Sequence, residues 1–262
     1  MNSKKLGQNF LQDISIIKQI VKALDIGKDD TIVEIGSGSG NLTRELVKEN
    51  NLIYALEFDQ NLGEKLRKNI TDPNLRIHIG DARIIQPEEF LNSDDYKLVG
   101  NLPYYAANRI MRNFLYSKNP PIMAVIMLQK EVAQKLISLQ KKNSFLSVNF
   151  GIHWTSTILR YVSREVFIPK PKVESAIVIM KRKENPLIEY EHLSLFFNLL
   201  KWGFNSPRKK IYNSISSGLN LSVQDIKNLL LDSGLDPDQR PETISVEAWV
   251  NLFYVWNNSK KI

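Results

Sequence analysis

Hydrophobic side chains along the first two thirds of the chain alternate between a spacing typical of helices and one typical of strands. Residues 14–24 carry apolar side chains at helical spacing, with Asp13 before them as a suitable N-cap and Gly27 as a stop. Seven short runs rich in apolar and β-branched residues predict strands, at Thr31–Ile35, Leu52–Glu57, Leu75–Ile79, Tyr96–Asn101, Ile122–Leu128, Thr157–Val162 and Ser175–Lys181. Amphipathic stretches predict helices near residues 41–49, 60–69, 106–116 and 129–139.

The succession of strand and helix predicts an α/β domain built on a Rossmann-like sheet. Parallel strands need a crossover between them, and a helix between the early strands supplies it. The last two predicted strands lie close together in the sequence. We therefore expect a mostly parallel sheet, covered on both faces, with one antiparallel edge strand.

The pattern changes near residue 185, where the strand runs stop. Leu193–Phe204 predicts an apolar helix, Ser222 begins a second helix that ends at Gly234, and Ser245 caps a last one. We therefore expect two domains, an α/β domain over residues 1–184 and a small all-α domain over residues 185–262.

Composition narrows the class of protein without naming a function. The 262 residues are 43% apolar and 24% charged, which is typical of a soluble globular protein. The chain has no cysteine, so disulfides, thiolate metal sites and cysteine nucleophiles are excluded. Three histidines stand far apart, and we expect no metal. The longest apolar run, Ile122–Leu128, is too short to span a bilayer, so we expect a cytoplasmic protein, with a monomer as the default.

The charge balance bears on the partner. Lysine and arginine total 35 against 28 acidic residues, which gives a net charge of +7 and a pI near 9.3. Such a surplus favours a polyanion, because neutralising phosphates releases counterions. The alternative is an ordinary solvated surface.

A glycine motif follows the first strand of the predicted sheet. Gly36-Ser-Gly38-Ser-Gly40 would let the backbone approach a nucleotide-like ligand, and Glu57, at the end of the next strand, could hold both ribose hydroxyls. Asn41 stands where a dinucleotide fold would have its third glycine. By itself the motif is compatible with S-adenosylmethionine, with a dehydrogenase cofactor or with a turn that binds no ligand. Asp81 follows the third strand, where it could reach the adenine of that ligand or merely cap a helix.

A second motif, Asn101-Leu102-Pro103-Tyr104, ends the fourth strand and should face the glycine motif. The amino group of adenine is a poor nucleophile, because its lone pair is delocalised into the ring. The side-chain oxygen of Asn101 and a nearby carbonyl could hold both N–H groups and favour a pyramidal nitrogen. Pro103 fixes the backbone, and Tyr104 offers a face on which a base can stack. The alternative is a strand-to-loop turn with the tyrosines in the core.

Taken together, six segments resemble the KsgA-type small-subunit ribosomal RNA adenine dimethyltransferases. The resemblance runs in order along nearly the whole chain. The segments are Leu6–Leu11, Glu34–Gly36, Asn101–Tyr105, Leu128–Val132, Phe167–Ser175 and Arg240–Ser245.

The resemblance implies a class I methyltransferase that uses S-adenosylmethionine as methyl donor. Its substrate would be two adjacent adenosines in a hairpin loop near the 3′ end of 16S rRNA, each methylated twice during biogenesis of the small subunit. Asn9 and Leu11 would belong to the cofactor site, with Gly36 at the methionine end, Glu57 on the ribose, and Asp81 with Ala82 at the adenine. Asn101 would serve both the cofactor and the target nitrogen, next to Leu102, Pro103 and Tyr104, and Phe167 would cover the target base opposite Tyr104.

Two positions depart from the family pattern. Ala106 and Ala107 stand where serine or threonine is frequent, so Asn108 must cap the next helix if any side chain does. Ser206-Pro207-Arg208-Lys209-Lys210 replaces a Gln-Arg-Arg-Lys-Thr stretch, so the cationic character survives but the backbone is in doubt.

The cations gather in two places that could hold RNA. Residues 159–183 interleave aromatic and proline residues with seven cations, Arg160, Arg164, Lys170, Lys172, Lys181, Arg182 and Lys183. Arg208–Lys210 forms a second cluster in the helical domain.

Two other functions compete with this interpretation. Enzymes that methylate large-subunit rRNA share several segments but tend to have isoleucine at the position of Leu102. Non-catalytic relatives that only bind nucleic acid tend to lose the motif that is intact here at Asn101–Tyr104.

Overall fold

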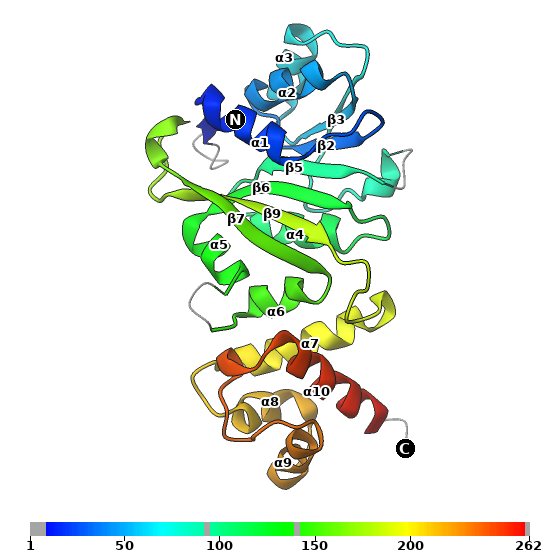
Figure 1. The fold of residues 1–262 in the computed structure, drawn as a ribbon, viewed down its shortest axis with the longest axis vertical. Coiled ribbons are helices and arrows are strands. Elements are labelled where there is room, and N and C mark those ends of the chain that lie inside the picture. Colours follow the sequence, from blue (N-terminus) through cyan, green and yellow to red (C-terminus); the bar gives the residue numbers. More distant parts are fainter. Residues whose placement is uncertain (1–8, 92–94, 139–141, 260–262) are drawn as a thin grey trace. The chain divides into compact units, whose positions relative to one another are not determined.

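The computed structural model describes residues 9–91, 95–138 and 142–259 (Figure 1). The strands are β1 (Phe10–Leu11), β2 (Thr31–Ile35), β3 (Leu52–Glu57), β4 (Leu75–Ile79), β5 (Lys97–Asn101), β6 (Met123–Gln129), β7 (Trp154–Val162), β8 (Phe167–Ile168) and β9 (Ser175–Arg182). The α-helices are α1 (Ile14–Ala23), α2 (Asn41–Leu46), α3 (Gln60–Asn69), α4 (Ala107–Leu115), α5 (Lys130–Leu136), α6 (Phe145–Gly151), α7 (Leu193–Phe204), α8 (Ile211–Leu219), α9 (Val223–Asp232) and α10 (Val246–Ser259).

A seven-stranded sheet in the order β4-β3-β2-β5-β6-β9-β7 forms the centre of the first compact unit. The five strands from β4 to β6 are parallel, and β6 pairs with β9 in antiparallel register from Met123↔Lys181 to Gln129↔Ser175. The expected mostly parallel sheet with an antiparallel part at one edge is confirmed. The antiparallel pairing lies one strand inside that edge, because β7 flanks β9.

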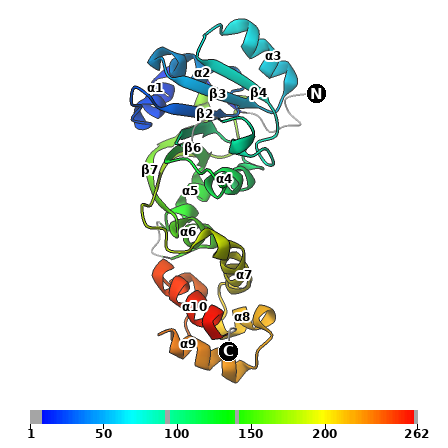
Figure 2. The same ribbon diagram turned by 90° about the vertical axis from the view of Figure 1, so that its right-hand side faces the viewer.

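Both faces of this sheet are covered, as the near-continuous apolar strands predict. Ile32 and Val125 join α1 and α2 in one hydrophobic cluster, whereas Val33 and Ile126, which face the other way, are also at most 1% exposed. Figure 2 shows α1 and α4 on opposite sides of the strands. Packing on both faces therefore fixes the position and direction of each strand whose carboxyl end reaches the site.

The chain divides into two compact units. The first holds the described residues up to Ala133 together with Thr157–Arg182, and the second holds Gln134–Ser156 with the described residues from Lys183 onward. The second unit therefore takes in α6, which precedes the predicted domain boundary between residues 184 and 185. That boundary stays a prediction.

Helix ends in the second unit follow the local signals in the sequence. Ser222 accepts a hydrogen bond from the backbone N–H of Asp225, and Gly234 adopts a φ of +74° just beyond α9. The hydroxyl of Ser245 accepts from the backbone of Ala248 at the start of α10. The predicted starts of α9 and α10 and the predicted end of α9 are therefore confirmed. Within the described residues, no helix has the length and apolarity needed to cross a membrane.

Candidate active site

A cavity of about 780 Å³, including its open mouth, lies where the carboxyl ends of β2, β3 and β5 meet the segments after β4 and β5. Nine residues expected in the site line it: Asn9, Gly36, Glu57, Asp81, Ala82, Asn101, Leu102, Pro103 and Tyr104. The topology brings these together because parallel strands present the same end at one edge of a sheet.

The glycine loop between β2 and α2 forms the floor of this cavity. Gly36, Gly38 and Gly40 all have positive φ angles, of 75°, 54° and 79°. A Cβ on Gly38 would lie 2.7 Å from the ring of Phe10, so only glycine lets β1 pack over the loop. A Cβ on Gly36 would meet only the carbonyl oxygen of Asn101, at 3.7 Å, and would project beside the motif at the end of β5.

Glu57 holds the end of β3 against the glycine loop. Its Oε2 accepts from the backbone N–H of Gly38 at 2.8 Å, and its Oε1 accepts from the N–H of Asp59 at 2.9 Å. The side chain is buried, and burial raises the pKa of its carboxyl. Each carboxylate oxygen can accept a further hydrogen bond from the side of the cavity. The two oxygens could therefore bind two neighbouring hydroxyl groups.

Asn101 is oriented by the N-terminal segment. Its Nδ2 donates to the carbonyl oxygen of Asn9 at 2.7 Å. Because the amide nitrogen is occupied in this way, the side-chain oxygen is the end of the amide that remains for a donor in the cavity. Phe10 packs on Gly38, and Asn41 donates from its Nδ2 to the carbonyl of Leu11 at 2.8 Å, so the segment itself is anchored.

Tyr104 lies at the side of the cavity next to β9. Its Oη forms a hydrogen bond of 2.7 Å with the hydroxyl of the buried Ser175, and burial raises its pKa. The carbonyl of Pro103 accepts from the N–H of Ala106 at 2.9 Å, which closes a turn between β5 and α4. The turn fixes the backbone that carries the Tyr104 ring.

A sequence model of the family described as ribosomal RNA adenine dimethylase matches residues 1–258. The chain belongs to this family. As a ribosomal RNA adenine dimethylase, it is a member of a methyltransferase family with the Rossmann-like fold described above.

Curated relatives of this dimethylase cover almost its whole length. "Ribosomal RNA small subunit methyltransferase A" of Clostridium botulinum (strain Okra / Type B1) is 37% identical over 254 residues, which are 95% of this chain and 92% of the relative. The protein of the same name in Dehalococcoides mccartyi (strain CBDB1) is 36% identical over 251 residues, covering 95% and 86%.

Two solved structures share the fold of this dimethylase. The 23S rRNA methyltransferase ErmE superposes with a TM-score of 0.74 at 25% identity, over 95% of this chain and 100% of the other. A dimethyladenosine transferase from Plasmodium falciparum superposes with a TM-score of 0.79 at 23% identity, over 96% and 98%.

The dimethylase does not bring two of the expected site residues to the cavity. Leu11 of β1 pairs with Phe167 of β8, and both side chains are buried in the hydrophobic cluster under the sheet, at 7% and 2% exposure. Neither lines the cavity. The role of Phe167 as a cover for the target base stays a prediction, as does the part of Leu11 in the cofactor site.

Among the lining residues that were not assigned a role from the sequence are Phe10, Phe58, Arg83 and Tyr105. Each adjoins or nearly adjoins an expected site residue, and only that proximity in the sequence could have indicated them. The helix α4 begins at Ala107 with Ala106 as its N-cap and without a side-chain cap, so Asn108, the one candidate that the sequence left, does not cap it.

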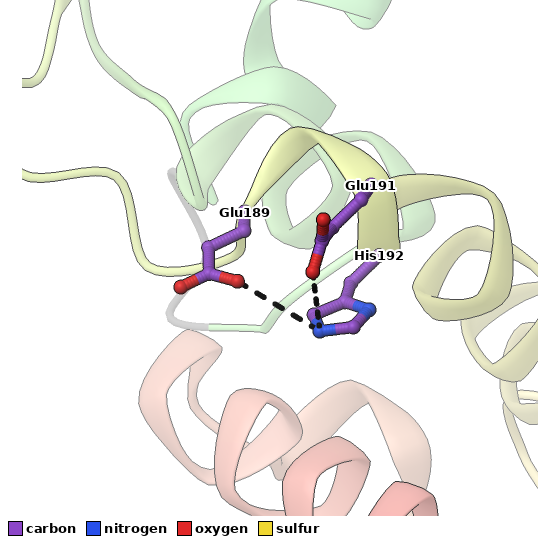
Figure 3. A group of neighbouring side chains, drawn as sticks. All are labelled: Glu189, Glu191 and His192. Atoms are coloured by element: carbon purple, nitrogen blue, oxygen red, sulfur yellow. Dashed lines mark ion pairs between the residues drawn. The ribbon is translucent and has the colours of Figure 1, made fainter.

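One group of three neighbouring metal-ligand side chains occurs in the described part of the chain (Figure 3). Its members are Glu189, Glu191 and His192, in the second unit. The Nε2 of His192 lies 3.8 Å from an oxygen of Glu189 and 3.5 Å from one of Glu191. Exposed carboxylates form such pairs with imidazole without a metal, so the group assigns no metal site.

Glu34, at the end of β2, is buried below the glycine loop. Its Oε2 accepts from the hydroxyl of Thr43 at 2.6 Å, which ties β2 to α2 across the loop. Burial, together with the nearby charge of Glu57, raises the pKa of Glu34 to about 7, although the Thr43 hydrogen bond opposes the shift. The Glu34 carboxyl group, which links the two ends of the glycine loop, therefore changes charge near neutral pH.

We expect Glu34→Gln to change the pH dependence of stability. With a folded pKa near 7 and an ordinary value of 4.5, the folded state holds a proton that the unfolded chain releases. Stability therefore falls as pH rises through this window, by about 3 kcal/mol in total. Glutamine still accepts from Thr43 and carries no charge, so the stability of the variant relative to wild type should increase as pH rises. Urea unfolding at several pH values from about 5 to 8 measures this.

The exposed Glu64→Gln on α3 is the matched control, and its difference from wild type should stay near zero throughout. A Glu34→Gln difference that does not vary with pH would contradict the argument.

Proposed function

We propose that this protein transfers methyl groups from S-adenosylmethionine to the exocyclic amino groups of two adjacent adenosines. These lie in a hairpin loop near the 3′ end of 16S rRNA and become dimethyladenosines as the small subunit is made. The observation that carries the proposal is the oriented amide of Asn101, which stands over the glycine loop in one cavity with Glu57. Relatives named for the small subunit support the choice of substrate.

The cavity residues fit the proposed methyl donor. The space beside Gly36 that a Cβ would fill admits the methionine end, and the Glu57 carboxylate has acceptors for two ribose hydroxyls. Asp81 and Ala82 line the same cavity, where a carboxylate and a backbone N–H can pair with the edge of an adenine. S-adenosylmethionine supplies an electrophilic methyl group.

Asn101 acts on the acceptor nitrogen and not as a base. Its side-chain oxygen accepts one N–H of the target amino group, and a nearby backbone carbonyl takes the other. Both contacts strengthen as the nitrogen becomes tetrahedral and positive, so they stabilise the transition state more than the ground state. An amide cannot take the proton, which the product ammonium loses to water.

The Tyr104 ring provides the stacking platform for the flipped-out base. The hydrogen bond to Ser175 and the Pro103 turn keep the ring in place before RNA arrives, which lowers the cost of ordering it. Phe167 is proposed as the second ring, which requires β8 to shift so that the buried side chain faces the base.

Two further parts of the proposal concern the setting. The enzyme works in the cytoplasm, as a monomer and without a metal, on a precursor of the small ribosomal subunit. Residues 1–184 carry the chemistry and residues 185–262 form a helical RNA-binding domain. The pattern of the sequence and the names of the relatives support these two parts of the proposal.

A labelling experiment tests the substrate. Purified protein with methyl-labelled S-adenosylmethionine is incubated separately with unmethylated small subunits and with large subunits. Label should enter 16S rRNA as dimethyladenosine at two adjacent positions. Label in 23S rRNA would favour the large-subunit alternative, for which the structural likeness to ErmE is the specific observation. Label in neither RNA would favour a binding protein without this activity.

Asn101→Ala should lose methyl transfer but keep RNA binding. One preorganised contact to a developing charge typically contributes about a hundred- to a thousandfold in rate. The measurement is single turnover at saturating RNA and cofactor, with mono- and dimethyladenosine separated by mass spectrometry. Both steps should slow, the second relying more on stacking because the monomethylated nitrogen has only one N–H.

Wild-type rates for both steps would contradict the polarising role and leave the motif as a rigid platform. Asn69→Ala, at the exposed end of α3, is a useful control, because this amide does not line the cavity.

The proposed RNA surface in the first unit combines cations with an exposed aromatic ring. Tyr161 of the edge strand β7 is 39% exposed, and the ammonium of Lys130 lies 5.1 Å from its ring centre. Arg160 on the same strand is also exposed. Lys130 is already paired with Glu174 at 2.7 Å, so the exposed Arg160 and the Tyr161 ring are the groups that suit a single-stranded RNA, which offers phosphates and unstacked bases.

The basic cluster at Arg208–Lys210 is the proposed RNA contact of the second unit. Ser206 accepts from the backbone of Lys209 in a turn, and Lys210 pairs with Asp238 at 2.7 Å. Within the described residues, Arg208 and Lys209 form no ion pair, and both are exposed. These two cations are therefore better placed for phosphates than Lys210.

Replacing Arg208 and Lys209 by alanine should lower RNA affinity and flatten the slope of log affinity against log salt. The slope should fall by about one unit for each phosphate that the protein no longer neutralises. Binding isotherms at four salt concentrations measure it. Lys210→Ala alone should change the slope less, and an unchanged slope in the double variant would make the cluster a solvated surface.

A further inference from the structure

Asp81 is held at the adenine end of the cavity by a neighbour two residues away. The Nε of Arg83 donates to both carboxylate oxygens, at 2.8 and 2.9 Å, and Nη2 donates to Oδ2 at 2.5 Å. The backbone N–H of Arg83 adds a bond to Oδ1 at 2.9 Å. This forked arrangement fixes the plane of the carboxylate as well as its position.

The same guanidinium lies close to two exposed rings at the rim. Its central carbon is 5.7 Å from the ring centre of Phe58, which follows β3, and 5.9 Å from that of Tyr105, which follows β5. These rings are 47% and 60% exposed, and all three side chains line the cavity. Cation–π attraction at such distances favours the guanidinium staying between the two strand ends.

We propose that Arg83 is a positioning residue for the methyl donor: it holds Asp81 in the orientation that accepts the adenine amino group. It also draws Phe58 and Tyr105 together at that end of the cavity. The proposal rests on the proposed function, which gives Asp81 its part in the cofactor site. It assigns Arg83 to cofactor affinity and leaves the chemical step to Asn101.

The charges around Asp81 agree with this role. The hydrogen bonds from Arg83 are the main cause that lowers the pKa of Asp81, with smaller help from the charge of Arg109. Asp81 therefore stays an acceptor over the working pH range. Arg109 contributes charge without a hydrogen bond to this carboxylate, which makes it the natural control.

Arg83 is not assigned a contact with the reacting nitrogen or with the methyl group. Its replacement can therefore change the affinity for the donor without changing the rate once the donor is bound. We expect Arg83→Leu to weaken binding of S-adenosylhomocysteine by about five- to thirtyfold, because the variant lacks both the charge-assisted pair and the cation–π attraction to the two rings. The single-turnover rate at saturating donor should stay within about twofold of wild type. Arg83→Lys should recover part of the affinity, because an ammonium keeps the charge but not the fork.

The experiment is a double-variant cycle measured by calorimetry with S-adenosylhomocysteine. It uses wild type, Arg83→Leu, Asp81→Asn and both together, with Arg109→Gln as control and thermal unfolding as a check on folding. If Arg83 acts through Asp81, the two losses of affinity should be far from additive, and Arg109→Gln should bind within about twofold of wild type.

The outcomes distinguish a failure of the proposed role of Arg83 from a failure of the proposed function. Wild-type affinity in Arg83→Leu, or full additivity with Asp81→Asn, would overturn the positioning role alone. Wild-type affinity in Asp81→Asn would instead remove Asp81 from the proposed cofactor site. A slowed single-turnover rate with unchanged affinity would also overturn the inference, because it would place Arg83 in the chemical step.

Discussion

The site depends on the hydrogen bond from the side-chain amide of Asn101 to the carbonyl of Asn9. An amide can present either a donor or an acceptor, and its chemistry toward an amino group depends entirely on which end is turned inward. The bond to Asn9 settles that choice before a ligand arrives. Everything that anchors the N-terminal segment therefore also orients the amide, including Phe10 against Gly38 and Asn41 on the carbonyl of Leu11.

Backbone geometry imposes the second constraint. The loop after β2 passes under β1 with no room for a Cβ at Gly38, and a Cβ on Gly100 of β5 would lie 2.5 Å from the carbonyl oxygen of Ile35. The two glycines allow the strands and the segment above them to approach closely. The carboxyl groups of Glu34 and Glu57 lie buried beside this close approach, and burial raises the pKa of each, although the hydrogen bonds that each accepts oppose the shift.

Strands and strand ends were predictable because they are encoded locally. The apolar run that ends at Asn101 and the capped helix that begins after Ser222 are local signals, and both occur as expected. The helix α8, Ile211–Leu219, was missed because its serines, asparagine and glycine favour helix weakly. Gly218 lies against the Trp202 ring, so this helix is held by packing that no local pattern reveals.

The same limit applies to the site. The sequence indicated which strand ends would meet, and hence most of the cavity lining. It could not indicate that Arg83 would turn back onto Asp81, or that Leu11 and Phe167 would pair and be buried, because side-chain direction depends on segments distant along the chain.

The pairing of β1 with β8 also has a consequence for synthesis. Phe10 and Ile168 meet from opposite ends of the first unit, and Gln12 donates from its backbone to the carbonyl of Val166 beside them. Closing so long a loop is slow and needs both segments to be present. A growing chain can assemble the parallel strands and their helices first, but the N-terminal segment has no partner strand until residues 167–168 have left the ribosome. A fragment that ends before residue 167 therefore lacks the strand that pairs with the N-terminal segment over the cavity.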